Sequence, residues 1–322
     1  MSFLQRIMKD LTGGFILAFH EIPAERFVSL VESLGSLEPV PLDTLIERSK
    51  ARKSTSGLFA ITVDDCVGEN TRRLVKVLEA KSWPATFYVP TLYLDSGEGM
   101  PFQWWFKLAP FLEGKVVRLK SQDLDFSVPE SASRFFSRME TLWHTQRPEA
   151  YVSTITEMVE ALILNHGIDR ATLTPPAPLP WEELTEFSRN DLIRFESHGV
   201  THSAMSSLST AEVEFEMLHS NKVIAEHTGR KCRHLAYPFG SPRSIGTRAA
   251  AVAARYYDSA TTMSLGSVDH ANPWLVPRIP LYPENSHKFA QIKILLKCCK
   301  PVSLNALMQS GRAPRFRFSE RK

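Results

Sequence analysis

Residues 58–66 read Leu-Phe-Ala-Ile-Thr-Val-Asp-Asp-Cys, an apolar run that ends in two adjacent carboxylates. The run predicts a buried β-strand whose C-terminal end presents Asp64 and Asp65. Open α/β sheets and β/α barrels bind their ligands at that edge. Because neighbouring side chains in a strand point to opposite faces, we expect the two acids to do different jobs, one holding a metal and the other taking a proton. An Asp-Asp pair is also typical of a solvated turn or a helix N-cap.

A second polar stretch lies at residues 196–203, which read Glu-Ser-His-Gly-Val-Thr-His-Ser. Its two histidines, His198 and His202, are four residues apart, so a helical turn or a tight loop lets both reach one ion. Imidazole nitrogen and carboxylate oxygen suit zinc or a similar divalent metal. A set of two His and one Asp leaves coordination positions open, as catalytic metal sites do. The spacing alone is weak evidence, and it gains weight because it follows the Asp pair at long range.

The chain around these stretches alternates between strand and helix signals. Residues 15–20 and 85–89 read as strands, and residues 69–81 have apolar positions at helical spacing. Residues 24–56 read as helix, short strand and helix, with Asp43 as the N-cap of the second helix. This order favours parallel β/α units.

Four segments together resemble the polysaccharide deacetylase family, the NodB-homology group that is similar to carbohydrate esterase family 4. Thr-Val-Asp-Asp-Cys resembles the family's Thr-Phe-Asp-Asp-Gly motif, and Ser-His-Gly-Val-Thr-His resembles its His-[Ser/Thr]-x-x-His metal motif. Two further segments look like the strand after the first motif and the third motif region. The four segments are residues 62–66, 84–89, 197–202 and 229–240. They occur in the family's order and cover roughly residues 15–285, so the resemblance is specific.

The resemblance implies an α/β fold, a distorted (β/α) barrel, and a hydrolase that removes N-acetyl groups from a sugar or polysaccharide. It implies a divalent metal held by Asp65, His198 and His202, and zinc is the ion that we expect. Cobalt, nickel and manganese are alternatives. Asp64 would be the general base that takes a proton from water, and an N-acetylated carbohydrate would be the substrate.

Three further residues receive roles from the resemblance. Ala18-Phe19-His20 is similar to the strand end of a subgroup that looks circularly permuted, which makes His20 the general acid. Phe239 stands where the family offers a backbone N–H to the oxyanion. The family's third-motif Arg falls at Ala236, and we expect Arg278 to replace it by orienting Asp64 and lowering its pKa. Considered alone, His20 would be a core histidine and Arg278 a surface arginine.

Two departures leave other functions open. Cys66 stands where the family has Gly, beside the metal, where it could crowd the site or bind the ion. The third-motif Arg is absent. A catalytically inactive protein that binds a glycan or a partner is therefore the second hypothesis. A third is an amidase or deformylase that acts on a small or lipid-linked sugar in surface polysaccharide assembly.

Composition sets further limits. The 322 residues are 43% hydrophobic and 23% charged, which is ordinary for a globular protein, and the net charge of +3 gives no argument for a nucleic-acid partner. The four cysteines have no disulfide spacing, the N-terminus has no apolar signal core, and no run approaches the ~20 apolar residues of a membrane span. We therefore expect reduced thiols and a cytoplasmic location.

The predicted organisation is a catalytic domain over residues 1–285, with a helical insertion at about 95–180, and a basic extension over residues 286–322. Within the insertion, an aromatic-rich stretch at residues 102–108 either packs on the barrel or stacks sugars. The extension holds nine Lys or Arg residues and one acid. Such a segment either packs a helix on the core or lies on an anionic membrane surface, and the second possibility predicts peripheral contact with the inner membrane face.

Overall fold

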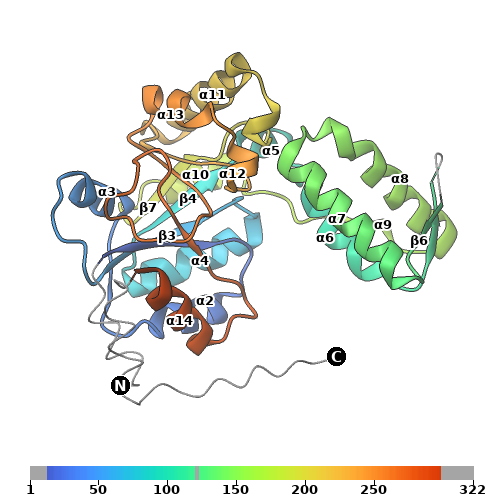
Figure 1. Cartoon of the computed structure of the whole chain (residues 1–322), viewed down its shortest axis with the longest axis horizontal. Helices are drawn as coiled ribbons and strands as arrows, with labels where there is room; N and C mark the ends of the chain where they lie inside the picture. Colours follow the sequence, from blue (N-terminus) through green and yellow to red (C-terminus); the bar gives the residue numbers. More distant parts are fainter. Residues whose placement is uncertain (1–12, 120–122, 299–322) are drawn as a thin grey trace.

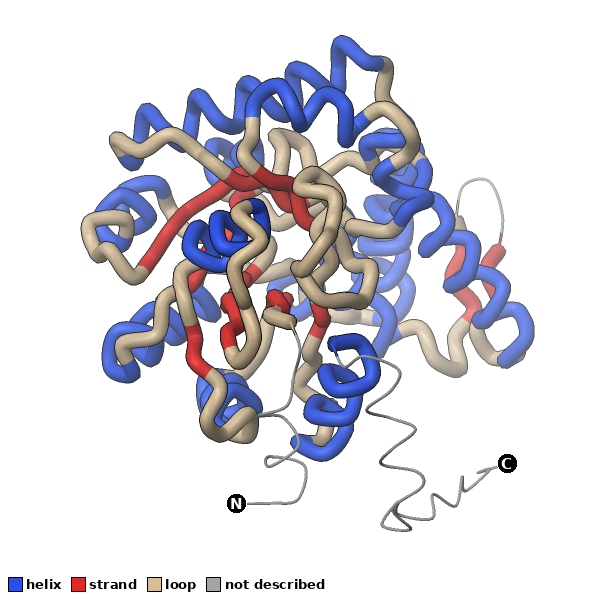
Figure 2. Tube along the Cα trace, turned by 60° about the vertical axis from the view of Figure 1, so that its left-hand side comes forward, coloured by secondary structure: helices blue, strands red, loops and turns tan. Residues whose placement is uncertain are grey.

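The computed structural model describes residues 13–119 and 123–298. Its main sheet is parallel throughout, with the order β10-β1-β3-β4-β7-β8-β9 and with β2 paired to β3. The strands are β1 (Phe15–Phe19), β2 (Glu38–Pro39), β3 (Leu58–Val63), β4 (Ala85–Val89), β7 (Ile193–Ser197), β8 (His234–Ala236), β9 (Ser259–Thr261) and β10 (Ile279–Pro280). Figure 2 shows these strands in red inside a shell of helices.

Residues 276–280 connect the two edges of this sheet. At one edge, the backbone N–H of Thr262 donates to the carbonyl of Val276 at 2.8 Å, and Val276 donates back to Ala260 at 2.9 Å. At the other edge, Ile279 pairs with Leu17 of β1. The sheet therefore curls into a distorted barrel, and the predicted fold is confirmed.

Alternate side chains along each strand point to the outside and to the inside of the barrel. In β3 the side chains of Phe59, Ile61 and Val63 belong to the core cluster outside the sheet, whereas Thr62 points into the barrel toward Arg278. The helices that follow or flank the strands are α2 (Ala24–Glu32), α4 (Gly68–Lys81), α5 (Thr91–Ser96), α10 (Trp181–Phe187), α11 (Thr210–Thr228), α12 (Pro242–Ile245) and α13 (Ala249–Tyr256). Burial of their apolar faces against the outer layer supplies the driving force for the barrel.

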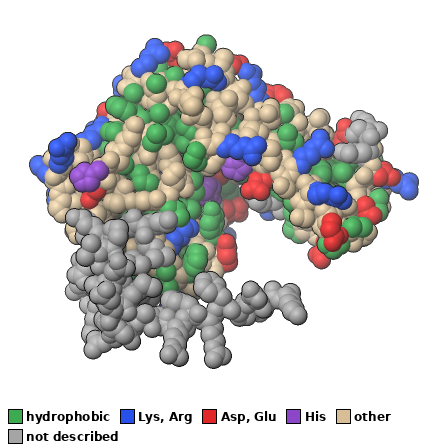
Figure 3. Space-filling model, viewed as in Figure 1, with side chains coloured by type: hydrophobic (Ala, Val, Ile, Leu, Met, Phe, Trp, Pro, Cys, Tyr) green, Lys and Arg blue, Asp and Glu red, His purple; other side chains and the backbone are tan. Residues whose placement is uncertain are grey.

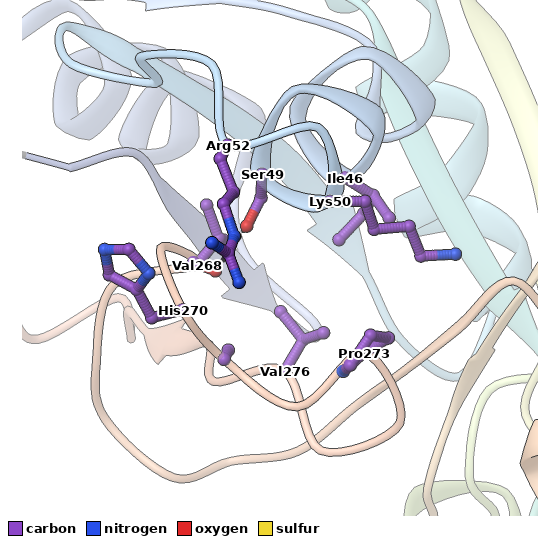
Figure 4. A pocket seen from close by; sticks show the side chains of 9 residues that line it. Ile46, Ser49, Lys50, Arg52, Val268, His270, Pro273 and Val276 are labelled. Atoms are coloured by element: carbon purple, nitrogen blue, oxygen red, sulfur yellow. Dashed lines mark hydrogen bonds between the residues drawn. The ribbon is translucent and has the colours of Figure 1, made fainter.

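The helix α3 (Leu42–Lys50) and residues 268–276 lie at the N-terminal ends of the strands, where Asp43 contacts His234 at the start of β8 and Val268 donates to the carbonyl of Gly14 just before β1. A cavity of about 370 Å³ lies there, lined by Ile46, Ser49, Lys50, Arg52, Val268, His270, Ala271, Pro273 and Val276 (Figure 4). The predicted helix, strand and helix over residues 24–56 are present as α2, β2 and α3. The predicted N-cap is wrong, because Pro41 occupies that position and the Asp43 carboxylate is hydrogen-bonded to the His234 ring at 2.8 Å.

The insertion forms a lobe at one side of the barrel, drawn mostly in green in Figure 1. It contains α6 (Pro101–Leu108), η2 (Ala109–Phe111), α7 (Pro129–Thr145), α8 (Glu149–His166) and α9 (Arg170–Leu173). It also contains a hairpin of β5 (Val116–Arg118) and β6 (Asp123–Asp125), which the sequence analysis missed. Its buried residues form a hydrophobic cluster of their own, in which Trp105 packs on Phe135 and Trp143.

The last described element is α14 (His287–Cys298), which lies beside α2. Its residues Ala290, Ile294 and Leu295 are buried in the same core cluster as the barrel helices. This part of the basic extension therefore packs on the core, as one of the two alternatives predicted. The rest of the extension lies outside the described residues, and the boundary at residue 285 stays a prediction. None of the described helices is long and apolar enough to cross a membrane.

Candidate active site

The predicted site residues converge at the C-terminal end of the barrel. Asp64 and Asp65 follow β3, His198 follows β7, and His20 follows β1. In the space-filling view, histidine and acidic side chains are visible in the notch between the barrel and the insertion (Figure 3). The cavity of Figure 4 lies at the opposite end of the strands, so it is separate from this site.

Arg278 and Asp64 form a bidentate ion pair inside the barrel. Two guanidinium N–H groups donate to Oδ1 and Oδ2 of Asp64 at 2.7 and 2.8 Å, and neither side chain is more than 2% exposed. Arg278 also donates to the Thr62 hydroxyl and lies over the ring of Tyr88. Burial alone would raise the pKa of Asp64, but the charge of Arg278 lowers it well below its usual range. Asp64 is therefore held as an oriented, ionised carboxylate.

Asp65, His198 and His202 form the cluster that could hold a metal ion in the described part of the chain. Their ligand atoms lie within 4.8 Å of one another, and all three residues are buried. Asp65 Oδ1 lies 3.7 Å from His198 Nε2 and 3.5 Å from His202 Nε2. These distances exceed hydrogen-bond length and leave space for a ligated ion between the three atoms.

The electrostatics of this cluster fit a divalent cation. Asp65 Oδ1 is buried and has no hydrogen-bond partner among the described residues, and burial raises the pKa of Asp65. A buried carboxylate in that state is costly unless a cation compensates it. Burial and the neighbouring charge of His198 lower the pKa of His202 well below its usual value, so its imidazole stays neutral and keeps a lone pair for a metal.

The backbone orients the side chains of the candidate metal ligands. His198 Nδ1 lies 2.7 Å from the carbonyl of Ala236, which accepts the ring N–H and leaves the Nε2 lone pair facing Asp65. Asp65 and His202 have φ values of 74° and 55°, in the left-handed region that non-glycine residues rarely occupy. Strain of this kind persists where the surrounding structure fixes the backbone, and it is frequent at functional sites.

His20 lies on the solvent side of the same cluster. Its Nε2 is 3.8 Å from Asp64 Oδ2, and its side chain is 39% exposed. The other ring nitrogen is buried without a hydrogen-bond partner in the described chain. The imidazole is thus close to the base and open to an incoming ligand.

The insertion completes one wall of the site. The ring of Phe102 in α6 stacks on His202 with 4.8 Å between centroids, and Phe239 meets the same imidazole edge-on at 4.8 Å. His144 of α7 packs on Phe239 at 5.0 Å. Of the aromatic stretch, Trp105 packs in the insertion core, whereas Phe102 faces a candidate ligand. Phe239 itself has a φ of 60°.

Cys66 does not join the metal cluster. Its thiol is fully buried in the outer hydrophobic core, and burial raises its pKa. The residue is outside the group of candidate ligands. Its φ of 53° explains why glycine would be favoured at this position.

A family model described as polysaccharide deacetylase matches residues 51–257. The chain belongs to the polysaccharide deacetylase family. The matched region contains both Asp-Asp residues, His198, His202 and Phe239. His20 and Arg278 lie outside it, and the structure brings both to the same site. The permuted motif order stays a prediction.

Solved deacetylase structures share this fold. The Streptococcus pyogenes deacetylase PplD in complex with acetate has a TM-score of 0.58 and 14% identity, covering 90% of this chain and 99% of that one. The BpsB deacetylase domain from Bordetella bronchiseptica has a TM-score of 0.53 and 14% identity, and the match covers 85% of this chain and 97% of that one. IcaB from Ammonifex degensii has a TM-score of 0.52 and 13% identity, covering 87% and 97%. At these identities the likeness concerns the fold alone. A search of curated proteins found no match.

Sequence reasoning missed three residues around this deacetylase site. Tyr88 faces the barrel interior beneath Arg278, a position that strand alternation could have indicated. The sequence marks Phe102 only as one member of an aromatic-rich stretch. Glu216 of α11 contacts the loop between the two histidines, and no local pattern marks it.

Proposed function

We propose that this chain is a metal-dependent deacetylase that hydrolyses N-acetyl groups of a sugar or polysaccharide. The observation that carries the proposal is the placement of the buried Asp65, His198 and His202 cluster beside the Asp64–Arg278 pair, at the ligand-binding edge of a deacetylase-family barrel. A binding protein has no need of an oriented base and a histidine beside three metal-type ligands.

Asp65, His198 and His202 would hold the ion, and zinc fits their nitrogen and oxygen donors. A divalent ion bound there supplies Lewis acidity for the acetyl carbonyl and for water. Asp65 contributes the negative charge, and each imidazole contributes one ring nitrogen, Nε2 in the case of His198.

Asp64 accepts the proton of the attacking water. Its Oδ2 faces the site, because it lies 3.8 Å from His20 Nε2 and 3.9 Å from His198 Nε2. Arg278 occupies one lone-pair direction of each carboxylate oxygen, which leaves the second lone pair of Oδ2 for the proton. The water oxygen bonds to the acetyl carbon as the proton moves to Asp64.

His20 delivers a proton to the sugar nitrogen as the C–N bond breaks. The products are acetate and a free amine. The backbone N–H of Phe239 would donate to the developing oxyanion, and a backbone donor does not depend on the side chain. The Phe239 ring contributes separately by covering His202.

The substrate is an N-acetylated carbohydrate, either polymeric or small and lipid-linked. The cytoplasmic location stays a prediction, and so does contact of residues 299–322 with the inner membrane face. Both would fit a substrate on the cytoplasmic side of surface polysaccharide assembly.

Acetate release tests the proposal. The zinc-loaded protein should release acetate from N-acetylglucosamine oligomers or from a poly-N-acetylglucosamine preparation, and Asp64→Asn should lose at least 100-fold in kcat. Asp43→Asn, which changes a carboxylate at the other end of the barrel, should keep the activity. Equal rates in the parent and Asp64→Asn would remove Asp64 as the base. Zinc binding without acetate release from either substrate would favour a glycan-binding function.

A further inference from the structure

The two candidate metal histidines are joined by a loop, Gly199-Val200-Thr201, whose backbone is held from both sides. On one side, backbone N–H groups of Thr91 and Leu92 donate to the carbonyls of Gly199 and Val200 at 3.2 and 3.0 Å. The Tyr93 hydroxyl donates to the carbonyl of Thr201 at 3.0 Å. The start of α5 therefore satisfies the acceptors of the loop.

On the other side, one buried carboxylate accepts the donors of the loop. Oε2 of Glu216 accepts the backbone N–H groups of Val200 and Thr201 at 2.6 and 3.0 Å. Its Oε1 accepts the Thr201 hydroxyl at 2.6 Å. Glu216 lies on α11 and is only 4% exposed. Hydrogen bonds to an ionised acceptor are about twice as strong as neutral ones, so these three fix the loop firmly.

The loop needs such a restraint because its backbone adopts left-handed φ values, which are energetically unfavourable for a residue other than glycine. Gly199 has a φ of 79°, and a Cβ placed there would lie 2.9 Å from Oε2 of Glu216. His202, at the end of the loop, has a φ of 55°. The carboxylate thus occupies the space that the glycine leaves, and it holds the turn that aims His202 at Asp65.

We propose that Glu216 is a positioning residue that sets the metal affinity of the site by holding the loop between His198 and His202. This inference rests on the proposed metal-binding function. Glu216 touches no ligand atom of the cluster and acts through the backbone of the loop. Groups that orient ligands in this way are typically worth roughly 10- to 100-fold in metal affinity.

The test is competition titration of the full chain with Zn²⁺ against a chromophoric chelator, supported by the visible absorption spectrum of the Co²⁺-loaded protein. Glu216→Ala should weaken Zn²⁺ binding by 10- to 100-fold and change the Co²⁺ spectrum. Glu216→Gln should keep most of the affinity, because its amide oxygen can still accept the two backbone N–H groups while its NH₂ donates to Thr201.

Asn221→Ala is the matched control. Asn221 lies on the same helix, is 6% exposed, and donates to the carbonyl of Cys232, away from the loop. Its removal destabilises α11 without touching the loop, so Zn²⁺ affinity should stay within about twofold of the parent. Thr201→Val removes the hydroxyl bond to Glu216, together with the contact of that hydroxyl with the Ser203 hydroxyl, and keeps both backbone bonds to Glu216. It should weaken Zn²⁺ binding by a smaller factor, and it replaces Glu216→Ala if that variant does not fold.

The outcomes separate the two proposals. A parent that binds no Zn²⁺ contradicts the proposed function itself. If the parent binds Zn²⁺ and Glu216→Ala binds it equally well, only the role of Glu216 is overturned. The same holds for Thr201→Val where it replaces Glu216→Ala. Equal losses in Glu216→Ala and Asn221→Ala would overturn it as well, because general destabilisation would then explain both. So would a loss in Glu216→Gln as large as in Glu216→Ala.

Discussion

The guanidinium of Arg278 holds the carboxylate of Asp64 by two parallel hydrogen bonds of 2.7 and 2.8 Å, across 214 residues of sequence. Arg278 stands in the segment that joins the two edges of the sheet, and Asp64 follows the interior strand β3. The contact that orients the proposed base therefore also ties the closing segment to the barrel. The orientation of the proposed base and the attachment of the closing segment thus involve the same ion pair.

Replacing Arg278 should affect both stability and activity. Arg278→Met leaves the Asp64 carboxylate buried without a counter-charge, which typically costs about 3–5 kcal/mol. We expect a loss of that size in the free energy of unfolding by urea and at least a 100-fold loss in acetate release. The double variant Asp64→Asn/Arg278→Met should recover part of the stability but none of the activity. An Arg278→Met protein as stable as the parent would show that the Asp64–Arg278 ion pair does not stabilise the barrel.

Removing the proposed acid should slow turnover and leave the metal in place. His20→Ala should lower kcat by roughly 10²- to 10⁴-fold, because the leaving amine loses its proton donor. Bound zinc, measured by elemental analysis, should not change. His270→Ala, at the opposite end of the barrel (Figure 4), is the matched histidine control and should keep full activity. Loss of zinc in His20→Ala would make His20 a ligand instead.

The insertion should influence zinc binding through Phe102. Phe102→Ala removes the ring stacked on His202 at 4.8 Å, and an aromatic pair of this kind is worth about 0.5–1.5 kcal/mol, or roughly 2- to 10-fold in affinity. Phe215 stacks on His219 at 4.9 Å on α11 and is half exposed, so Phe215→Ala is a matched control with no expected effect on zinc. Equal zinc affinity in Phe102→Ala and the parent would show that the wall is not needed to hold His202.

The contribution of Asp43, at the N-terminal end of the barrel strands, to the free energy of unfolding should depend on pH. Burial alone would raise the pKa of Asp43, but the hydrogen bond and charge of His234, together with Arg233, lower it. A carboxylate with a lowered folded pKa adds stability above its unfolded pKa of about 3.9 and loses that contribution as the pH falls through the folded value. The unfolding free energy of the parent should therefore exceed that of Asp43→Asn by about 1 kcal/mol at pH 6, with the gap closing below about pH 4. A gap that widens in acid would be opposite in sign to this expectation.

The local parts of the fold and site could be predicted from sequence. The strand over residues 58–63 and the Asp pair after it are encoded within eight residues, and the two histidines within five. Family resemblance added His20 and Arg278, whose proximity to Asp64 depends on how distant strands meet. No periodicity in the sequence specifies such a contact, because it results from closure of the barrel.

Where sequence reasoning failed, a tertiary contact was responsible. Asp43 has a good N-cap side chain, yet it bonds His234, which is 191 residues away. Glu216 looks like an ordinary helix residue until the loop of residues 199–201 folds against it. The β5–β6 hairpin has strands of only three residues, too short for the alternation of side chains to be detected.

The proposed metal site is tested most directly by the amount of divalent metal bound to the purified chain. Elemental analysis measures it after incubation with Zn²⁺ and removal of the excess. We expect about one ion per chain in the parent and in Cys66→Ala, and none in Asp65→Ala or His202→Ala. A parent chain without zinc, or an Asp65→Ala variant that keeps it, would contradict a metal site formed by Asp65, His198 and His202.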